Sequence, residues 1–204
     1  DIMDEEGEIR IPVQDTTHLK FNIVGDHVHN YDWMINLAHF KGHAMGGFGG
    51  VLKNQSIGVA SANGKAYIHT AGKTADKNLI WKENRDVPQD HFIEAMAAAA
   101  QSVHDYFNGN ILYINVMNNL SVDCDCNNHP ADPEMKDVGI LASTDPVALD
   151  QACVDLVFNY PSQEGDDAKA LIERINSRHG VHIIEHSAAI GLGSREYELV
   201  KIDN

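Results

Sequence analysis

Residues 33–53 read WMINLAHFKGHAMGGFGGVLK. Apolar side chains dominate residues 31–40, which is typical of a buried strand ending at His39. A glycine-rich turn follows at residues 46–50, and residues 51–60 predict a short helix that begins directly after it. This succession of strand, turn and helix is the building unit of α/β proteins.

The rest of the chain continues the alternation of strands and helices. Residues 90–107 form the clearest predicted helix, because apolar positions recur every three or four residues. We therefore predict a single α/β domain over residues 18–204, with a parallel or mixed sheet flanked by helices, preceded by a polar arm or edge segment at 1–17. Further strands are predicted at 18–28, 65–70, 111–117, 138–142 and 196–202, further helices at 145–160, 168–177 and 181–190, and a mobile loop at 71–90.

Composition excludes several classes of function. The net charge of −15 argues against nucleic acid and anionic membrane surfaces, because phosphates would be repelled. No apolar run approaches the roughly 18–20 residues that span a bilayer. The three cysteines cannot make a disulfide framework or supply the four ligands of an ordinary iron–sulfur cluster, so we expect reduced thiols and a cytoplasmic protein. The first residue is Asp1, so we expect a fragment of a longer chain.

Histidine and lysine side chains cluster around the predicted turn. His39 and His43 are four residues apart, and His69 follows further along the chain. Neutral imidazoles suit zinc, nickel, copper or iron, so His39, His43 and His69 could bind a metal. Lys53 could bind a phosphate or act as a nucleophile if burial lowers its pKa. The alternative is that one histidine packs, the other is solvated, and Lys53 lies at the surface.

The glycines of the turn allow backbone amides to approach a ligand closely. Gly46, Gly47, Gly49 and Gly50 precede the predicted helix start, where the helix dipole favours a phosphate or a carboxylate. Lys53 is not followed by the residues of a P-loop motif. A tight turn without a ligand explains the same glycines.

A second cluster lies at residues 123–129, with the sequence DCDCNNH. Cys124, Cys126 and His129 offer two thiolates and an imidazole from one loop, and zinc or iron accepts such ligands. The alternative is a turn in which Asp and Asn side chains bond their own backbone. Each cluster directly follows a predicted strand, and ligands of α/β folds bind beyond the carboxyl ends of the strands, so we expect the two clusters to converge.

Several segments together resemble a bacterial and archaeal family with a domain of unknown function, whose members are often described as iron–sulfur-centre proteins. Many members carry a ferredoxin-like insert with cysteine-rich runs soon after the region of His69, and this chain has none. The resemblance therefore implies the family's α/β domain without its cluster. The resembling segments are residues 39–43, 46–54, 116–126, 139–150, 191–194 and 197–199.

The order of His43, the glycine-rich turn, Lys53 and His69 is also similar to that of nickel-pincer lactate racemases. This resemblance implies His43 as an acid or base, Lys53 as the anchor of a pyridinium-derived nucleotide, and His69 as a nickel ligand. The glycine loop would then hold the phosphate of that cofactor.

These observations predict a protein that binds a transition metal (zinc, iron or nickel) or a metallocofactor. One hypothesis is an enzyme of the racemase, isomerase or redox type that acts on a small hydroxy-acid-like substrate. The other is a non-enzymatic metal-binding module or the partner of a redox protein.

Overall fold

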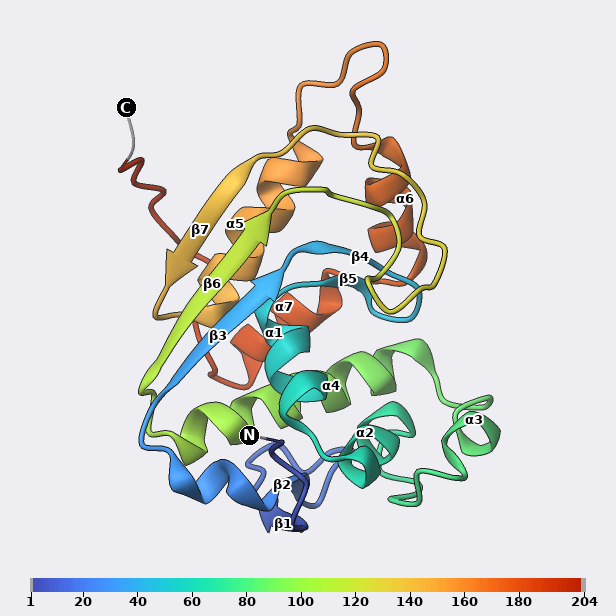
Figure 1. Cartoon of the computed structure of the whole chain (residues 1–204), viewed down its shortest axis with the longest axis vertical. Coiled ribbons are helices and arrows are strands. Elements are labelled where there is room, and N and C mark those ends of the chain that lie inside the picture. Colours follow the sequence, from blue (N-terminus) through green and yellow to red (C-terminus); the bar gives the residue numbers. More distant parts are fainter. Residues whose placement is uncertain (1, 203–204) are drawn as a thin grey trace.

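The computed structural model describes residues 2–202 of the chain. Within them, the central sheet consists of three strands in the order β3 (Met34–His39), β6 (Ile111–Met117) and β7 (Gly139–Ser143) (Figure 1). β3 and β6 are parallel, whereas β7 is antiparallel to β6. The predicted α/β fold with a mixed sheet is confirmed.

The register of the sheet brings two strand ends together. His39, the last residue of β3, lies opposite Val116, near the end of β6. The loops that follow the two strands therefore leave the same edge of the sheet, as the sequence predicts.

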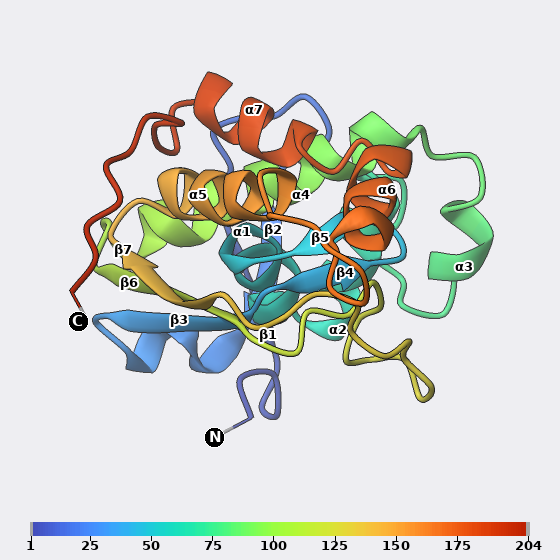
Figure 2. The same ribbon diagram turned by 90° about the horizontal axis from the view of Figure 1, so that it is seen from above.

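Helices cover one face of this sheet. α4 and α5 lie between the sheet and α7 (Figure 2), which makes a layered α/β arrangement. The helical segments are η1 (Asp26–Asn30), α1 (Val51–Lys53), the π-helical turn η2 (Asn54–Gly58), α2 (Ala62–His69), α3 (Ile80–Glu83), α4 (Gln89–Tyr106), α5 (Pro146–Phe158), α6 (Lys169–Ser177) and α7 (His182–Ala189). None of the helices in the described part of the chain has both the length and the hydropathy needed to cross a bilayer.

Two small antiparallel sheets complete the structure. β1 (Glu8–Ile11) pairs with β2 (Asn22–Gly25), so the predicted polar arm contains a strand. β4 (Lys41–His43) pairs with β5 (Gly47–Gly49), so the glycine-rich segment is a hairpin rather than a simple turn.

Two predicted strands are wrong. Residues 65–69 belong to α2 and Thr70 is its C-cap, because the Ser61 hydroxyl accepts a hydrogen bond from the Gly64 amide (3.0 Å) and starts a helix there. Residues 196–202 form no strand. Among them Tyr197 donates a hydrogen bond to Asp155 on α5 (2.8 Å), and no backbone ladder forms.

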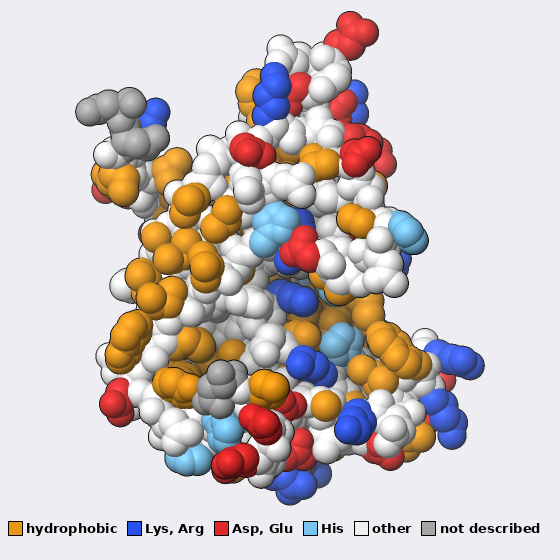
Figure 3. Space-filling view, in the orientation of Figure 1, with side chains coloured by type: hydrophobic (Ala, Val, Ile, Leu, Met, Phe, Trp, Pro, Cys, Tyr) orange, Lys and Arg blue, Asp and Glu red, His pale blue; other side chains and the backbone are white. Residues whose placement is uncertain are grey.

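The outer face of the central sheet is apolar. A hydrophobic band follows the three strands on the face seen in Figure 3, and a hollow beside it holds Lys or Arg and His side chains. The band includes the exposed side chains of Trp33, Ile35, Leu37, Leu112 and Ile140.

Candidate functional site

The loop after β3 and the loop after β6 meet at the edge of the sheet. The Gly42 amide donates a hydrogen bond to the Ser121 carbonyl (2.8 Å). A Cβ atom at Gly42 would lie 2.1 Å from the Val122 carbonyl oxygen, so only glycine allows this approach. The expected convergence of the two clusters is confirmed.

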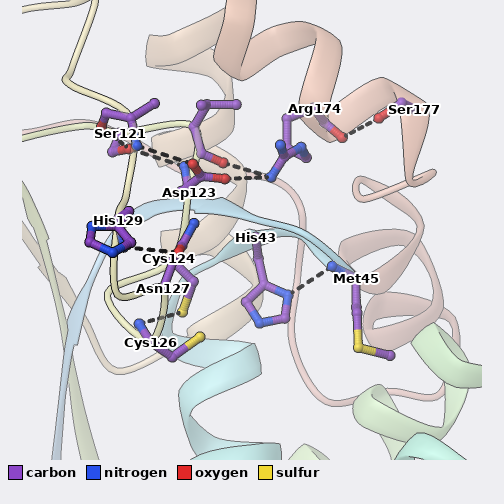
Figure 4. Close-up of polar contacts among 12 residues, drawn as sticks. His43, Met45, Ser121, Asp123, Cys124, Cys126, Asn127, His129, Arg174 and Ser177 are labelled. Atoms are coloured by element: carbon purple, nitrogen blue, oxygen red, sulfur yellow. Dashed lines mark hydrogen bonds and ion pairs between the residues drawn. The ribbon is translucent and has the colours of Figure 1, made fainter. Parts of the chain in front are cut away.

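Three ligand-type side chains come together where these loops meet. One donor atom each from His43, Cys124 and Cys126 lies within 4.8 Å of the others. Figure 4 shows the His43 ring and the two sulfur atoms close to one another. We call these three residues the cysteine site.

The two thiols differ in their exposure. Cys124 is buried and Cys126 is exposed, and the Cys126 amide lies 3.5 Å from the Cys124 sulfur. The hydrogen bond with Cys124 raises the pKa of the Cys126 thiol, and burial raises it further. A bound cation would reverse this effect by stabilising the thiolates.

Hydrogen bonds determine which nitrogen of His43 carries the proton. Its Nδ1 atom accepts hydrogen bonds from the amides of Met45 (3.2 Å) and Gly46 (3.0 Å). The neutral ring therefore carries its hydrogen on Nε2. Burial, followed by the charge of Lys53, lowers the pKa of His43 to about 3, so the ring is neutral at physiological pH. His43 is consequently a hydrogen-bond donor through Nε2.

Lys53 is the last residue of α1 and lies beside the cysteine site. Burial lowers the pKa of its amine, whereas the nearby Cys124 and Cys126 thiols act in the opposite direction. Among residues 2–202, no carboxylate forms an ion pair with Lys53. A partly buried ammonium without a carboxylate partner attracts an anionic ligand.

His69 has the opposite tautomer to His43. Its Nδ1 atom lies 2.7 Å from the Lys65 carbonyl oxygen, which can only accept, so Nδ1 carries the hydrogen and Nε2 carries the lone pair. The ring stacks on Phe92 with a centroid distance of 5.0 Å. Burial is the main cause that lowers the pKa of His69, and Lys53 adds to it. A histidine that donates to a carbonyl and presents a free nitrogen is oriented as metal ligands usually are.

The other two predicted histidine ligands lie outside this group. His39 has Nε2 2.7 Å from the Asn118 carbonyl and Nδ1 3.0 Å from the Asp125 carboxylate, so both nitrogens face oxygen acceptors. Asp125 also pairs with Lys41 (3.1 Å). His129 is exposed, and its amide is bonded to the Asn127 side chain in a turn of the kind that the sequence left open.

The amides at the start of α1 are already bonded to a carboxylate of the chain. Asp150 on α5 accepts hydrogen bonds from the amides of Val51 and Leu52, both at 3.0 Å, and from the Asn115 side chain at 2.7 Å. A Cβ atom at Gly50 would lie 2.3 Å from this carboxylate. Complete burial raises the pKa of Asp150 to about 6. The position where the sequence predicts a cofactor phosphate therefore holds an internal anion.

The other glycines of the hairpin serve close packing. Gly47 has a φ of +83°, and a Cβ atom there would lie 2.8 Å from the Gly180 Cα after α6. Gly46 and Gly49 meet only ordinary contact distances, 3.4 Å and 3.7 Å for their nearest atoms. The four predicted cofactor-binding glycines thus lie in the hairpin that positions His43.

Two cationic side chains lie near the site that the sequence does not predict as site residues. Lys41 precedes His43 on β4, and Arg174 on α6 donates to the Val122 carbonyl at 2.9 Å and lies 3.3 Å from Asp123. Both contribute to the lowered pKa of His43. Their contacts join the two loops and α6, which are far apart in the sequence, so no local sequence motif predicts that these side chains lie near the site. The third cysteine, Cys153 on α5, is buried, and the Asn115 side chain donates a hydrogen bond to its sulfur (3.3 Å).

Comparison with known families assigns the chain to a family whose domain has no known function. Residues 1–155 match the family model of a domain of unknown function, DUF362. The match covers more than half of the chain, so the protein belongs to this family, and the family resemblance seen in the sequence is confirmed. No curated protein and no solved structure matches the chain significantly.

Proposed function

We propose that the protein binds one transition-metal ion at Cys124 and Cys126 and uses this centre on a small anionic, hydroxy-acid-like molecule. The observation that carries the proposal is the approach of His43, Cys124 and Cys126 to within 4.8 Å of one another, next to Lys53, which forms no ion pair with a carboxylate of residues 2–202. Two thiolates and nitrogen donors are the ligands that zinc and iron prefer in proteins.

The donor set supports an ion with an open coordination position. The two sulfur atoms supply two ligands. His69 lies close enough to His43 to lower its pKa, and its Nε2 carries the lone pair, so we propose it as the third ligand. His43 carries its hydrogen on Nε2, so we assign it to a hydrogen bond with the bound molecule rather than to the ion. A metal with an open position would supply a Lewis acid that polarises an oxygen of the substrate.

The charges around the site favour an anionic substrate. Lys53 supplies an ammonium without a carboxylate partner, and Lys41 and Arg174 add positive charge close by. A carboxylate of the substrate would bind Lys53, while the His43 Nε2–H donates to its hydroxyl or carbonyl oxygen. His43 stays neutral while it does so, as a histidine of lowered pKa does when it polarises a carbonyl. Of the roles implied by the resemblance to nickel-pincer lactate racemases, this proposal keeps His69 as a metal ligand, and it gives His43 and Lys53 different roles.

Elemental analysis by plasma mass spectrometry, on protein purified without a histidine tag, tests the proposal. We expect about one zinc, iron or nickel per chain at the cysteine site, lost in Cys124→Ser/Cys126→Ser and retained in the control His129→Gln. Lys53→Met should retain the metal but lose binding of lactate, measured by calorimetry. Equal metal content in the wild-type and double-serine proteins would exclude the metal assignment. Unchanged lactate binding in Lys53→Met would exclude the role of Lys53.

A redox dithiol is the second candidate function, favoured by the contact between the two thiols. The sulfur atoms of Cys124 and Cys126 lie within 4.8 Å of each other, and Cys126 is exposed, so a partner could reach it. Oxidation would join the two sulfurs and pass two electrons and two protons to a disulfide such as oxidised glutathione. Titration of the metal-free protein with glutathione redox buffers, followed by mass spectrometry, would detect this disulfide. If both thiols remain free at every ratio, this candidate is excluded.

A further inference from the structure

A second group of ligand-type side chains lies away from the cysteine site, where α7 packs on α4. His182 and His186 of α7 are four residues apart and so project from one face of the helix. Glu94 of α4 faces them, and one donor atom each from Glu94, His182 and His186 lies within 4.8 Å of the others. We call these three residues the His–Glu cluster.

The cluster is partly shielded from water. The side chains of Glu94 and His182 are each 21% exposed, and that of His186 is 18% exposed. A second trio, His179, His182 and Glu185, shares His182 but is more exposed, because the side chain of His179 is 56% and that of Glu185 44% exposed. The more sheltered trio is therefore the better candidate for holding an ion.

Each residue of the His–Glu cluster also contacts a neighbouring charged or imidazole side chain, which orients it. The Nε2 atom of His182 lies 3.0 Å from one oxygen of Glu94, and its Nδ1 atom lies 3.5 Å from Glu185. The other oxygen of Glu94 contacts His18 at 2.6 Å, and Asp15 contacts His186 at 2.8 Å. Carboxylates and histidines around ligating side chains are the usual outer partners of metal ligands.

The charge of the group suits a divalent cation. The Glu94 carboxylate lies beside His182 and His18, and the Asp15 carboxylate lies beside His186. When ionised, the carboxylates of Glu94 and Asp15 carry two negative charges, which match a divalent cation held beside the imidazoles of His18, His182 and His186. Protons on the imidazoles make these contacts in the absence of an ion, and a metal would replace them.

We propose that Glu94, His182 and His186 form a second metal site, for zinc or a divalent ion of similar preference. Two histidines and one glutamate are an established zinc ligand set, and a water molecule would complete the tetrahedron. The ion would connect α7 to α4 and, through His18 and Asp15, to the segment before β2. This site uses none of the residues of the cysteine site, so either proposal stands without the other.

Zinc titration of the Cys124→Ser/Cys126→Ser protein tests the proposal, because that background lacks the thiolates. Calorimetry should detect one zinc per chain, and Glu94→Gln or His186→Gln added to the background should weaken binding by more than about tenfold. His179→Gln is the matched control, since it removes a neighbouring histidine outside the trio, and it should bind zinc as the background does.

Imidazole resonances provide a readout that does not depend on further variants. In the double-serine protein, zinc should shift the NMR signals of His182 and His186 together and saturate at one equivalent, with those of His129 unmoved. The proposal is overturned if the double-serine protein takes up no zinc. It is also overturned if zinc leaves both resonances unchanged, or if His179→Gln abolishes binding while His186→Gln does not.

Discussion

The cysteine site and the His–Glu cluster contain the same kind of side chain in opposite electrostatic surroundings. His43 and His69 are buried near Lys53, and their pKa values are lowered. At His182, hydrogen bonds with Glu94 and Glu185 outweigh the burial that opposes them and raise the pKa. The first pair is therefore neutral at physiological pH, whereas His182 takes up a proton more readily.

This difference shows that histidine content alone does not identify a site. The chain has twelve histidines, and their chemistry depends on the neighbours that the fold supplies. Neutral imidazoles beside a lysine suit an anionic ligand, and imidazoles beside carboxylates suit a cation.

The cysteine site and the His–Glu cluster should differ most in how much free energy of unfolding is lost when a carboxylate is removed. Asp150 accepts three buried hydrogen bonds beneath the hairpin of the cysteine site. We expect Asp150→Ala to lower the free energy of unfolding by about 3 kcal/mol or more, since each unpaired buried donor costs roughly 1–3 kcal/mol. Glu94→Gln, at the partly exposed cluster, should cost much less. Urea denaturation measures both, and equal costs would contradict the buried role of Asp150.

The pH dependence of stability should have opposite signs in the two regions. Folding keeps His43 neutral, with a pKa of about 3 against 6.5 for the free group. Its contribution is thus present above pH 6.5 and is lost by up to about 1.4 kcal/mol per pH unit as the pH falls toward 3. His43→Gln should therefore lose less stability on acidification than the wild type does.

His182 should act in the other direction. Its pKa is raised in the folded state, so its stabilisation is present below pH 6.5 and is lost as the pH rises through the folded pKa. Between pH 7.5 and 5.5, His182→Gln should lack a gain in stability that the wild type shows. Urea midpoints over this range measure both variants, and slopes of the same sign would contradict the comparison.

Lysine reactivity offers a smaller test of the same contrast. Burial lowers the pKa of Lys53, whereas the Asp166 carboxylate raises that of Lys136. Reductive methylation, followed by mass spectrometry over a pH series, should therefore reach half of its maximal rate at a lower pH for Lys53 than for Lys136. The reverse order would show that the Lys53 ammonium has a partner that stabilises it.

The smallest effect is expected at His129, which is exposed and outside both groups. His129→Gln should change the free energy of unfolding by less than about 0.5 kcal/mol, as surface substitutions usually do. Thermal denaturation and metal content should match those of the wild type. A loss of metal in this variant would add His129 to the ligands of the cysteine site.

Much of the fold could be predicted from local patterns. The strands at β3 and β6, the long helix α4 and the helix that Asp145 caps follow from hydrophobic periodicity and cap residues. The predicted strand at the His69 segment is wrong, because Tyr67 and Ile68 favour a strand locally whereas the cap at Ser61 starts a helix. The last residues alternate like a strand, but no neighbouring strand pairs with them.

The part of the cysteine site that could be predicted is the part whose position follows from the order of the strands. Two loops that follow parallel neighbouring strands must meet, so the approach of His43 to Cys124 and Cys126 could be expected. The contacts of Asp150 with the amides of residues 51 and 52 span about a hundred positions and depend on how α5 packs. The His–Glu cluster likewise depends on the packing of α7 on α4, although the spacing of His182 and His186 is visible in the sequence.

X-ray absorption at the edge of the metal found in the native protein tests the central claim most directly. The sample should be the His186→Gln protein, so that metal bound at the His–Glu cluster contributes little to the absorption signal. The account predicts about two sulfur neighbours at about 2.3 Å, as for zinc thiolates, with nitrogen or oxygen atoms completing the shell. A shell without sulfur would contradict the assignment of the ion to Cys124 and Cys126.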